Sequence, residues 1–324
     1  MMAPLDSPAP IPGRVAILGA TGFIGRWVAE AVNRRGDQSL LLGRDVGALV
    51  AAYAGTGGAD GGRRFAAVDA REPESLRSQL DDFAPSLILN LAGYGVDRGE
   101  RDEETASLVN ATLPRWLAEW AAESGARLVH VGSALEYGTA TGDLCEDTVP
   151  APTTLYGRTK LAGTDAVAEV GARAGARVMT ARLFTVYGLG EHAGRLLPSI
   201  IEARQDGRTL PLSEGLQRRD FAYVEDVADG LLRLADAPTH AGEVVNLATG
   251  VLTTVREFAQ IAAEVLGVAS SQLQFGTVPV RAEEMAHEPV SIARLLALTG
   301  WRPEPSLASG LARVRERLAE RPTR

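Results

Sequence analysis

The sequence predicts an α/β fold with a doubly wound parallel sheet, and three observations lead to this expectation. Short apolar runs alternate with helical stretches through residues 14–188, which is typical of parallel strands joined by crossover helices. The first apolar run ends in a glycine-rich turn that leads directly into a helix. After residue 188 the alternation becomes irregular. We therefore expect a large domain over 14–188, to which segments near 219–250 return, and a smaller C-terminal region over 189–324.

Each element follows from its local pattern. Buried parallel strands appear as short apolar runs, which occur at residues 15–18, 39–42, 65–68, 87–91, 128–131, 178–184 and 244–247. Helical patterns occur at residues 26–35, 72–83, 106–124, 156–171, 198–207 and 254–266. The glycine-rich stretch 53–62 predicts a loop. The proline-rich residues 1–13 predict a disordered lead, because they lack the basic start and apolar core of a signal peptide.

Composition excludes several classes of protein. The chain has 33 Lys+Arg against 41 Asp+Glu, a net charge of −8, which argues against the broad basic surface that binds nucleic acid. Its single cysteine, Cys145, cannot form a disulfide framework or a cysteine-based zinc cluster, and we expect no metal site. No apolar run approaches the roughly 18 residues that predict a membrane span. We therefore expect a cytoplasmic protein without a nucleic-acid or membrane partner.

The turn after the first apolar run predicts a nucleotide site. Gly19, Gly22 and Gly25 lie between the first expected strand and the first expected helix. Glycine lets the backbone turn tightly and approach a pyrophosphate, whose charge is stabilised by the N-terminus of the helix. A purely structural turn is the alternative. The position directly after the first strand favours a Rossmann domain that binds NAD or NADP.

The end of the second expected strand bears on the choice between NADP and NAD. An acidic residue there would hydrogen-bond the ribose hydroxyls of NAD, but the position holds Gly43, followed by Arg44. A guanidinium pairs with the 2′-phosphate of NADP, whereas a carboxylate repels it. Asp45 lies close enough to keep NAD open, and an ordinary surface charge is the alternative role of Arg44. We favour NADP, with NAD as the second choice.

Two further features indicate acid–base chemistry. Tyr156 and Lys160 are four residues apart, so they share one face of an expected helix. A nearby ammonium favours the phenolate and lowers the pKa of the tyrosine, which suits a general acid or base. Ser133 ends an expected strand at the carboxyl edge of the sheet, where ligands bind in open α/β folds. An exposed Tyr–Lys pair and a serine that caps a turn are the ordinary alternatives.

Together with further motifs, these features resemble the extended short-chain dehydrogenase/reductase family, the NAD(P)-dependent nucleotide-sugar epimerases, dehydratases and reductases. The resemblance covers residues 14–312, nearly the whole chain. The motifs that carry it, in chain order, are GATGFIG at 19–25, VDARE at 68–72, NLAG at 90–93, GSALEYG at 132–138, YGRTK at 156–160, RLFTVYG at 182–188, QRRDFAYVEDVA at 217–228 and GWRPEPSLASGL at 300–311.

The resemblance implies roles for individual residues. Tyr156 would exchange a proton with the reacting oxygen, Ser133 would orient that oxygen, and Lys160 would lower the pKa of Tyr156 and bind the nicotinamide ribose. With Arg44 included, the residues expected to bind the cofactor are Gly19, Thr21, Gly22, Phe23, Ile24, Gly25, Arg44, Asp69, Ala70, Leu91, Ala92, Gly93 and Lys160. Those expected to bind the substrate are Ala134, Thr185, His192 and Arg219.

The resemblance also implies partners. Arg219 would meet the diphosphate of a nucleotide sugar, although an ion pair with Asp220 or Glu225 is the alternative. A homodimer would form through the helices expected at 106–124 and 156–171. The substrate implied is a small molecule, a nucleotide sugar.

The chain departs from this family at positions that bear on the reaction. Dehydratases have one or two acids directly after the hydroxyl of the serine loop, where this chain has Ala134 and Leu135, so we do not expect a dehydratase. Glu136 lies one residue further, and on an extended segment its side chain would point to the other face. Thr185 replaces an asparagine that contacts substrate, and Leu189 replaces a proline.

These features predict an NAD(P)H-dependent ketoreductase that acts on a nucleotide-linked 4-keto-6-deoxysugar, with a tyrosine as general acid. Two other enzymes stay open, namely a nucleotide-sugar epimerase that retains NAD and a reductase of a non-sugar carbonyl, such as a polyketide-like compound. A non-enzymatic cofactor sensor is a further alternative, and the intact set of Ser133, Tyr156 and Lys160 argues against it.

Overall fold

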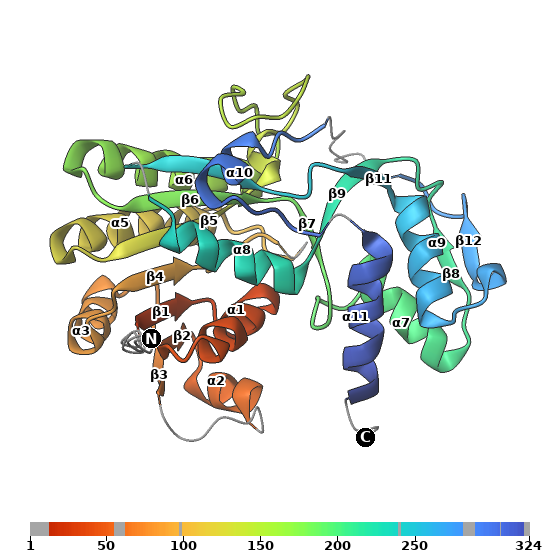
Figure 1. Ribbon diagram of the computed structural model, residues 1–324, viewed down its shortest axis with the longest axis horizontal. Helices are drawn as coiled ribbons and strands as arrows, with labels where there is room; N and C mark the ends of the chain where they lie inside the picture. Colours follow the sequence, from red (N-terminus) through yellow and green to blue (C-terminus); the bar gives the residue numbers. More distant parts are fainter. Residues whose placement is uncertain are drawn as a thin grey trace, which may run out of the picture.

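Figure 1 shows the computed structural model, which describes residues 13–54, 62–96, 99–238, 241–280, 289–304 and 306–320. Within these ranges the strands are β1 (Arg14–Leu18), β2 (Gln38–Gly43), β3 (Arg63–Ala67), β4 (Leu87–Asn90), β5 (Arg127–Ser133), β6 (Val178–Leu183), β7 (Thr185–Tyr187), β8 (Leu210–Leu212), β9 (Arg218–Tyr223), β10 (Glu243–Leu247), β11 (Leu252–Thr254) and β12 (Leu273–Phe275). The α-helices are α1 (Phe23–Arg34), α2 (Val46–Tyr53), α3 (Pro73–Phe83), α4 (Glu103–Ser107), α5 (Leu113–Ser124), α6 (Leu155–Ala174), α7 (Leu196–Asp206), α8 (Val224–Asp236), α9 (Val255–Leu266), α10 (Ala293–Thr299) and α11 (Leu307–Glu320).

The central element is a seven-stranded sheet with the strand order β10-β6-β5-β4-β1-β2-β3. Every neighbouring pair in it is parallel. From β1 the chain moves to β2 and β3 on one side, then crosses to β4 and continues outward on the other. This order confirms the predicted doubly wound, Rossmann-type fold. It also creates a switch point between β1 and β4, where open α/β sheets bind their ligands.

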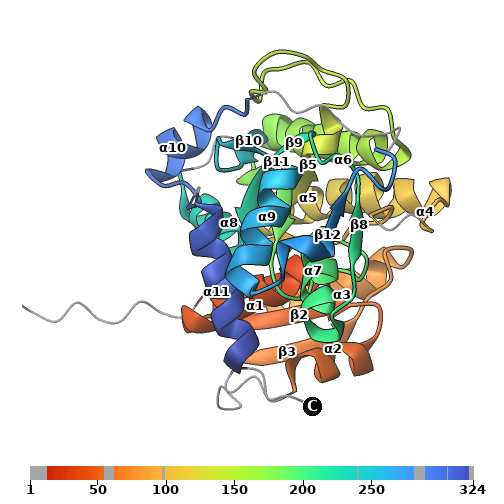
Figure 2. The ribbon, with the colours of Figure 1, turned by 90° about the vertical axis from the view of Figure 1, so that its right-hand side faces the viewer.

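Both faces of this sheet are covered by helices. Successive residues of a strand point to opposite faces. In β1, Val15 and Ile17 therefore belong to the hydrophobic layer shared with α1 and α8, while Ala16 and Leu18 belong to the layer shared with α3, α5 and α6. All four are buried. Figure 1 and Figure 2 show the sheet between these two groups of helices, which explains the short apolar runs in the sequence.

The smaller region lies beyond one end of the large sheet, on the right in Figure 1. In it, β9 pairs in parallel with β7 and antiparallel with β11, while β8 and β12 form a separate parallel pair. The helices α7, α9 and α11 pack with these strands. The strand β10, which lies between β9 and β11 in the sequence, returns to the large sheet beside β6.

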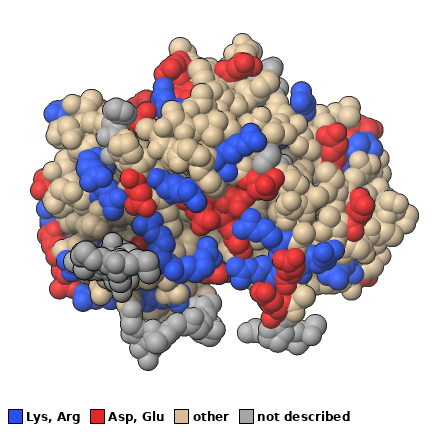
Figure 3. All heavy atoms as spheres, in the orientation of Figure 1, with Lys and Arg blue, Asp and Glu red and all other residues tan. Residues whose placement is uncertain are grey.

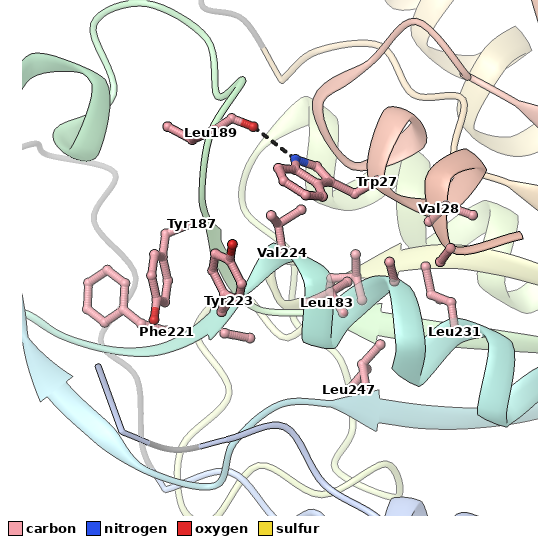
Figure 4. Close-up of a cluster of buried hydrophobic side chains, with 14 of the residues drawn as sticks. Trp27, Val28, Leu183, Tyr187, Leu189, Phe221, Tyr223, Val224, Leu231 and Leu247 are labelled. Atoms are coloured by element: carbon pink, nitrogen blue, oxygen red, sulfur yellow. Dashed lines mark hydrogen bonds between the residues drawn. The ribbon is translucent and has the colours of Figure 1, made fainter. Parts of the chain in front are cut away.

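A buried cluster of aromatic and aliphatic side chains joins the two regions (Figure 4). Trp27 of α1 donates from Nε1 to the carbonyl oxygen of Leu189 at 2.9 Å. Beside it the ring of Tyr187 lies 5.7 Å from that of Tyr223 and meets Phe258 edge-on at 5.2 Å. Because this cluster is buried, the loop after β7 is held against the beginning of α1.

Ion pairs also connect α11 to the large domain. Arg313 reaches Glu225 and Asp226 of α8 at 2.8 and 2.7 Å. Arg317 reaches Glu225 at 3.0 Å and Glu30 of α1 at 3.3 Å. Figure 3 shows basic and acidic side chains intermixed on this face of the molecule. The arginines here therefore meet acids of the same chain.

Several boundaries differ from the prediction. α1 begins at Phe23, inside the glycine motif, and α2 lies where the sequence predicted no helix, with the Asp45 carboxylate as its N-cap. The helix predicted over 106–124 is longer and contains a π-helical turn at Leu108–Thr112. The predicted lead, apart from Gly13, and most of the predicted loop 53–62 lie outside the described residues.

Candidate active site

The glycine turn lies at the switch point, between β1 and α1. Gly19 has a φ of +78°, and a Cβ on it would lie 2.8 Å from the backbone of Leu91 at the end of β4. A Cβ on Gly25 would lie 2.2 Å from the carbonyl oxygen of Gly19. Only glycine allows the turn, the helix and β4 to approach one another so closely. The turn therefore presents backbone to the sheet edge, as a phosphate site requires.

The beginning of α1 fits a pyrophosphate. Gly22 is the N-cap, and this fully described first turn has neither a side-chain cap nor an acidic residue. Its backbone N–H groups are thus available to an anion, together with the positive end of the helix dipole. Thr21 is exposed beside Gly22, while Phe23 and Ile24 are half-buried against the core. These residues suit the phosphates of a dinucleotide.

Two carboxylates and two arginines lie where β2 and β3 end. The Asp69 carboxylate accepts from Arg71 Nε at 3.0 Å. This hydrogen bond, together with a weaker attraction to Arg44, lowers the pKa of Asp69 to about 2. Asp45 accepts from a backbone N–H of α2 at 3.1 Å and so caps that helix. We refer to the exposed group Arg44, Asp69 and Arg71 as the Arg44 corner.

The residues after β4 form the next part of the sheet edge. Leu91 packs against the core on the α1 side, whereas Ala92 packs on the α3 side together with Ala70. Gly93 is exposed. The backbone N–H of Leu91 donates to the β1 residue Leu18, which holds this segment beside the glycine turn. The predicted cofactor residues after β1, β2, β3 and β4 thus lie along one edge of the sheet.

Asn110 is a site residue that the sequence analysis missed. It is buried in the π-helical turn, where its Oδ1 accepts from Tyr94 N at 3.0 Å and its Nδ2 donates to Tyr94 O at 2.7 Å. Its Nδ2 also donates to Thr159 Oγ1 at 2.9 Å. The amide therefore binds the loop after β4 to α6, and π turns of this kind often occur at functional sites. A lone amide among apolar helix positions was its only signal in the sequence.

Ser133, Tyr156 and Lys160 lie together at the carboxyl end of β5. Ser133 is the last residue of that strand, and the two others stand one turn apart on α6, whose N-cap is Thr154. Ser133 acts on the phenol of Tyr156, because it lowers the pKa of that group. Gly95 has a φ of +98°, and a Cβ there would lie 3.3 Å from the Tyr156 ring. The loop after β4 therefore packs directly on the phenol ring.

Burial controls the ionisation of these groups. Burial raises the pKa of Tyr156 to about 12, and the charge of Glu136 also raises it, while Ser133 and Arg195 act in the opposite direction. Burial lowers the pKa of Lys160 to about 8, although Glu136 opposes this effect. The prediction of a lowered tyrosine pKa is therefore wrong for the protein by itself, because desolvation exceeds the attraction of nearby cations. Tyr156 is a neutral phenol, the form that can donate a proton.

Glu136 is fully buried and bound on both carboxylate oxygens. Oε1 accepts from Ser133 N at 2.7 Å, and Oε2 accepts from Arg182 Nε at 2.8 Å and Thr164 Oγ1 at 2.9 Å. The prediction of an extended backbone here is wrong, because Ala134–Glu136 forms a 3₁₀ turn closed by a capping box. Glu136 nevertheless holds the serine loop in place and does not face a substrate.

His130 is a second buried residue whose partners the sequence did not reveal. Its Nδ1 lies 3.1 Å from Asn90 Nδ2 and its Nε2 lies 3.4 Å from Lys160 Nζ. Burial and the charge of Lys160 lower the pKa of His130 well below its usual value. The imidazole is therefore neutral, and it contacts the side chain of Lys160, a predicted catalytic residue.

The predicted substrate residues occupy three places. Ala134 is buried in the 3₁₀ turn beside Ser133. Thr185 and Arg219 belong to one small sheet, because Thr185 of β7 pairs with Phe221 of β9, two residues from Arg219. His192 is exposed in the loop before α7.

The two acids offered as ion-pair partners of Arg219 have other partners. Asp220 is buried and accepts from the backbone N–H groups of Thr249 and Gly250 at 2.9 and 2.8 Å. Glu225 is bound by the arginines of α11, as described above. Both acids therefore have structural roles that do not depend on Arg219.

Glu191 is an acid that the sequence analysis missed. It lies in the loop after β7, where its Oε1 accepts from Gly188 N at 3.0 Å. Burial raises its pKa to about 7, while this hydrogen bond and the charge of Arg195 oppose the shift. The same loop is bound to α1, because Arg26 donates to the carbonyl oxygen of Gly190 at 3.2 Å. A carboxyl group with a pKa near neutrality therefore lies in the loop that is bound to α1.

The described residues contain neither a candidate membrane helix nor a candidate metal cluster. No helix among them is both long and apolar enough to cross a membrane. The same part of the chain contains no group of three or more His, Cys, Asp or Glu side chains that could hold a metal ion.

Comparisons with known proteins identify relatives of the whole chain. Residues 15–248 match the model of the NAD dependent epimerase/dehydratase family. The chain is 31% identical over 319 residues to dTDP-6-deoxy-L-talose 4-dehydrogenase (NAD(P)(+)) of Kitasatospora kifunensis, which covers 94% of this chain and 95% of that protein. It is 29% identical over 265 residues to GDP-6-deoxy-D-mannose reductase of Pseudomonas aeruginosa, with 76% and 84% covered.

Solved structures share the fold. DesIV of Streptomyces venezuelae, a dTDP-glucose 4,6-dehydratase with NAD and TYD bound, superimposes with a TM-score of 0.81 at 25% identity, covering 95% of this chain and 97% of that one. The dTDP-glucose 4,6-dehydratase of Bacillus anthracis, in complex with NAD, superimposes with a TM-score of 0.82 at 18% identity, covering 94% and 96%.

Proposed function

Because this chain belongs to the NAD dependent epimerase/dehydratase family, we propose that it is an NAD(P)H-dependent ketoreductase of a nucleotide-linked 4-keto-6-deoxysugar. The observation that carries the proposal is the neutral phenol of Tyr156, which lies with Ser133 at the sheet edge that also holds the glycine turn. A proton donor beside a dinucleotide site is what the reduction of a carbonyl group requires.

Family membership confirms the resemblance to the extended short-chain dehydrogenases/reductases. The chain is therefore an NAD(P)-dependent enzyme of this type, and its relatives include nucleotide-sugar dehydrogenases, reductases and epimerases. The relatives from Kitasatospora kifunensis and Pseudomonas aeruginosa are named as a 6-deoxysugar 4-dehydrogenase and a 6-deoxysugar reductase. These names support a nucleotide-linked 6-deoxysugar as the substrate.

Each residue of the site has a separate role in the proposed reduction. The nicotinamide cofactor, when bound, supplies the hydride to the carbonyl carbon. Tyr156 donates its phenolic proton to the carbonyl oxygen, and Ser133, which lies with Tyr156, orients that oxygen. Lys160 binds the ribose beside the reacting centre. Thr185 and Arg219 approach from the smaller sheet, where Arg219 offers a guanidinium to the diphosphate.

We favour NADP as the cofactor because of the Arg44 corner. Arg44 is exposed at the end of β2, and Asp45, the acid that could repel a 2′-phosphate, is occupied as the N-cap of α2. NAD is the second choice, since the solved relatives contain NAD and the name of the Kitasatospora kifunensis enzyme includes both cofactors.

Other reactions of this family fit the site less well. A dehydratase needs an acid where this chain has Ala134 and Leu135, and Glu136 has its oxygens occupied. An epimerase that retains NAD is the second candidate, because relatives of this chain include UDP-glucose 4-epimerase and dTDP-L-rhamnose 4-epimerase. Reduction of a non-sugar carbonyl would need the same proton donor with a different pocket.

Replacement of Tyr156 by Phe tests the proposal. Purified protein is mixed with NADPH and a nucleotide-linked 4-keto-6-deoxyhexose, and the loss of reduced-nicotinamide absorbance is followed. Tyr156→Phe should lower kcat roughly 10²–10⁴-fold, the usual contribution of a general acid, while NADPH binding is retained. Tyr223→Phe, which removes a tyrosine hydroxyl bonded to Glu225 in the core, is the matched control and should keep its turnover.

The outcome separates the candidates. If the wild-type protein leaves NADPH unchanged but converts a nucleotide hexose to its epimer, the chain is an epimerase. A cofactor sensor would bind NADPH, show no turnover and behave identically after Tyr156→Phe.

We also propose a homodimer through the α4–α5 segment and α6. The two helices α5 and α6 lie side by side and are joined by Arg115 and Glu169 at 2.6 Å, so they form one continuous surface. Size-exclusion chromatography with light scattering measures the mass of the protein in solution. A monomeric mass would contradict this proposal.

A further inference from the structure

Three polar side chains from three different elements form a buried line beneath the active site. Asn90 comes from β4, His130 from β5 and Lys160 from α6. All three are buried, and the register of the two strands places Asn90 opposite His130. The imidazole therefore connects a buried amide to Lys160, with contacts of 3.1 Å at Nδ1 and 3.4 Å at Nε2.

The backbone determines which way the Asn90 amide points. Its Oδ1 accepts from the N–H of Ala92 at 3.2 Å. A flipped amide would turn its NH₂ group toward that N–H, donor against donor. The Nδ2 group of Asn90 therefore faces His130 and donates to Nδ1, which must be the unprotonated nitrogen of the ring.

A neutral imidazole with a bare Nδ1 carries its hydrogen on Nε2. That N–H points at Lys160 Nζ. An ammonium has three donors and no acceptor, whereas a neutral amine has a lone pair that can accept this N–H. We propose that Asn90 and His130 act as positioning residues that favour the neutral amine of Lys160, by presenting an N–H where an ammonium would need an acceptor.

The other groups around Lys160 act in both directions. Glu136, in the 3₁₀ turn, favours the ammonium, but its carboxylate is already paired with Arg182 of β6. Tyr156, one turn earlier on α6, is neutral. Burial disfavours the ammonium, in agreement with the lowered pKa of Lys160, about 8. The N–H of His130 thus adds to the effect of burial and opposes that of Glu136.

The consequence for the site is a charge that changes within the working range of pH. Below its pKa, Lys160 is an ammonium and favours the phenolate of Tyr156, and above it this attraction is lost. The Asn90–His130 pair therefore sets the pH at which the charge of Lys160, one helical turn from Tyr156, changes. Its effect on kinetics rests on the proposed reductase activity, but the hydrogen-bond arrangement itself does not.

Nitrogen NMR of the protein labelled with ¹⁵N-histidine tests the arrangement without substrate. The chain has four histidines, and the resonance that disappears in His130→Phe identifies the one of interest. We expect a protonated Nε2 and a bare Nδ1, with no change down to about pH 6, near the usual histidine pKa. A hydrogen on Nδ1, or a charged ring at that pH, would overturn the proposal.

The pH profile of kcat/KM tests the effect on Lys160. Without the opposing N–H, His130→Phe should move the limb that belongs to Lys160 upward by about one pH unit, a tenfold change in proton concentration. Asn90→Ala frees the ring to place its hydrogen on Nδ1 and should move the Lys160 limb in the same direction. This variant replaces His130→Phe in the test if His130→Phe does not fold.

The matched control is Thr180→Val. Thr180 is buried and lies opposite His130 in the β5–β6 pair, and its hydroxyl has no hydrogen-bond partner among the described residues. The Thr180→Val variant should leave the pH profile of kcat/KM unchanged. Profiles that shift in all three variants, or in none, would overturn the proposal. A protein with the expected histidine resonances but no reductase activity would instead refute the proposed function and leave this inference standing.

Discussion

The two polar clusters at the sheet edge differ in their contact with water. Beneath Tyr156, the polar side chains are buried and hold defined partners, as Glu136 does with Arg182. In the Arg44 corner, by contrast, the charges face solvent, and Asp69 and Arg71 pair at an exposed site. Both clusters flank the same candidate cofactor site, but only the first is shielded from solvent.

Because of this difference, charge affects the free energy of unfolding more strongly in the buried cluster than in the Arg44 corner. Buried charges carry a large desolvation cost, so each must keep its partner, and the burial itself shifts pKa values. Exposed charges interact through water and salt, so their pairing contributes little to folding and can change at low cost. We therefore expect changes in the buried cluster to affect stability and acid–base chemistry, and changes in the Arg44 corner to affect the choice of cofactor.

The largest effect is expected when the buried ion pair is broken. Glu136→Gln keeps the shape of the side chain but leaves the Arg182 guanidinium buried without a compensating charge. The free energy of unfolding, measured with denaturant, should fall by about 3–5 kcal/mol.

The matched control breaks an exposed pair. Asp82→Asn removes the 2.9 Å contact between Asp82 and Arg64 on the surface and should cost at most about 1 kcal/mol. Equal losses in the two variants would show that burial does not distinguish the two kinds of charge pair.

Much of the fold could be predicted from sequence because both faces of the sheet are buried. Most strands therefore contain a short apolar run, and the strand boundaries in the large sheet differ from those predicted by at most a few residues. Motif spacing also placed Ser133 at a strand end and put Tyr156 one helical turn before Lys160, where the structure has them.

The contacts that decide the chemistry could not be predicted in this way. Asn90 and His130 meet because of the register between β4 and β5, and neither residue signals that register. Asn110 reaches the site through a π turn, which interrupts the regular helical spacing on which sequence reasoning depends. The hydrogen bond between Glu136 and the serine loop could not be predicted, because it depends on the 3₁₀ turn over Ala134–Glu136.

Glu191, in the loop after β7, is a half-buried acid, and no described residue forms an ion pair with it as close as that between Glu136 and Arg182. Burial raises the pKa of Glu191 from 4.5 to about 7, so the folded protein binds more protons than the unfolded chain between these pH values. Stability therefore falls as the pH rises from about 4.5 to 7 and then stays at the lower level. Glu191→Gln cannot ionise, and its amide oxygen can still accept from Gly188.

Thermal unfolding over a pH series measures this effect. Above about pH 7, Glu191→Gln should be more stable than the wild type by about 2 kcal/mol, allowing for partial contact with solvent, and the advantage should vanish near pH 4.5. Glu123→Gln, at an exposed ion pair with Arg77, is the control and should show little dependence on pH in this range. An advantage of Glu191→Gln that is the same at all pH values would mean that ionisation of Glu191 is not its cause.

The smallest effect is expected in the Arg44 corner, where solvent screens the charges. Arg44→Ala should weaken NADPH binding roughly tenfold, about 1.4 kcal/mol, and leave NADH binding unchanged, because only NADPH carries the 2′-phosphate. Added salt should reduce this preference for NADPH in the wild type, as expected for an exposed charge pair. Arg64→Ala, at an exposed arginine of β3 that pairs with Asp82, is the control. Titration of cofactor fluorescence measures each affinity. Equal losses of affinity for NADPH and NADH would show that Arg44 does not bind the 2′-phosphate.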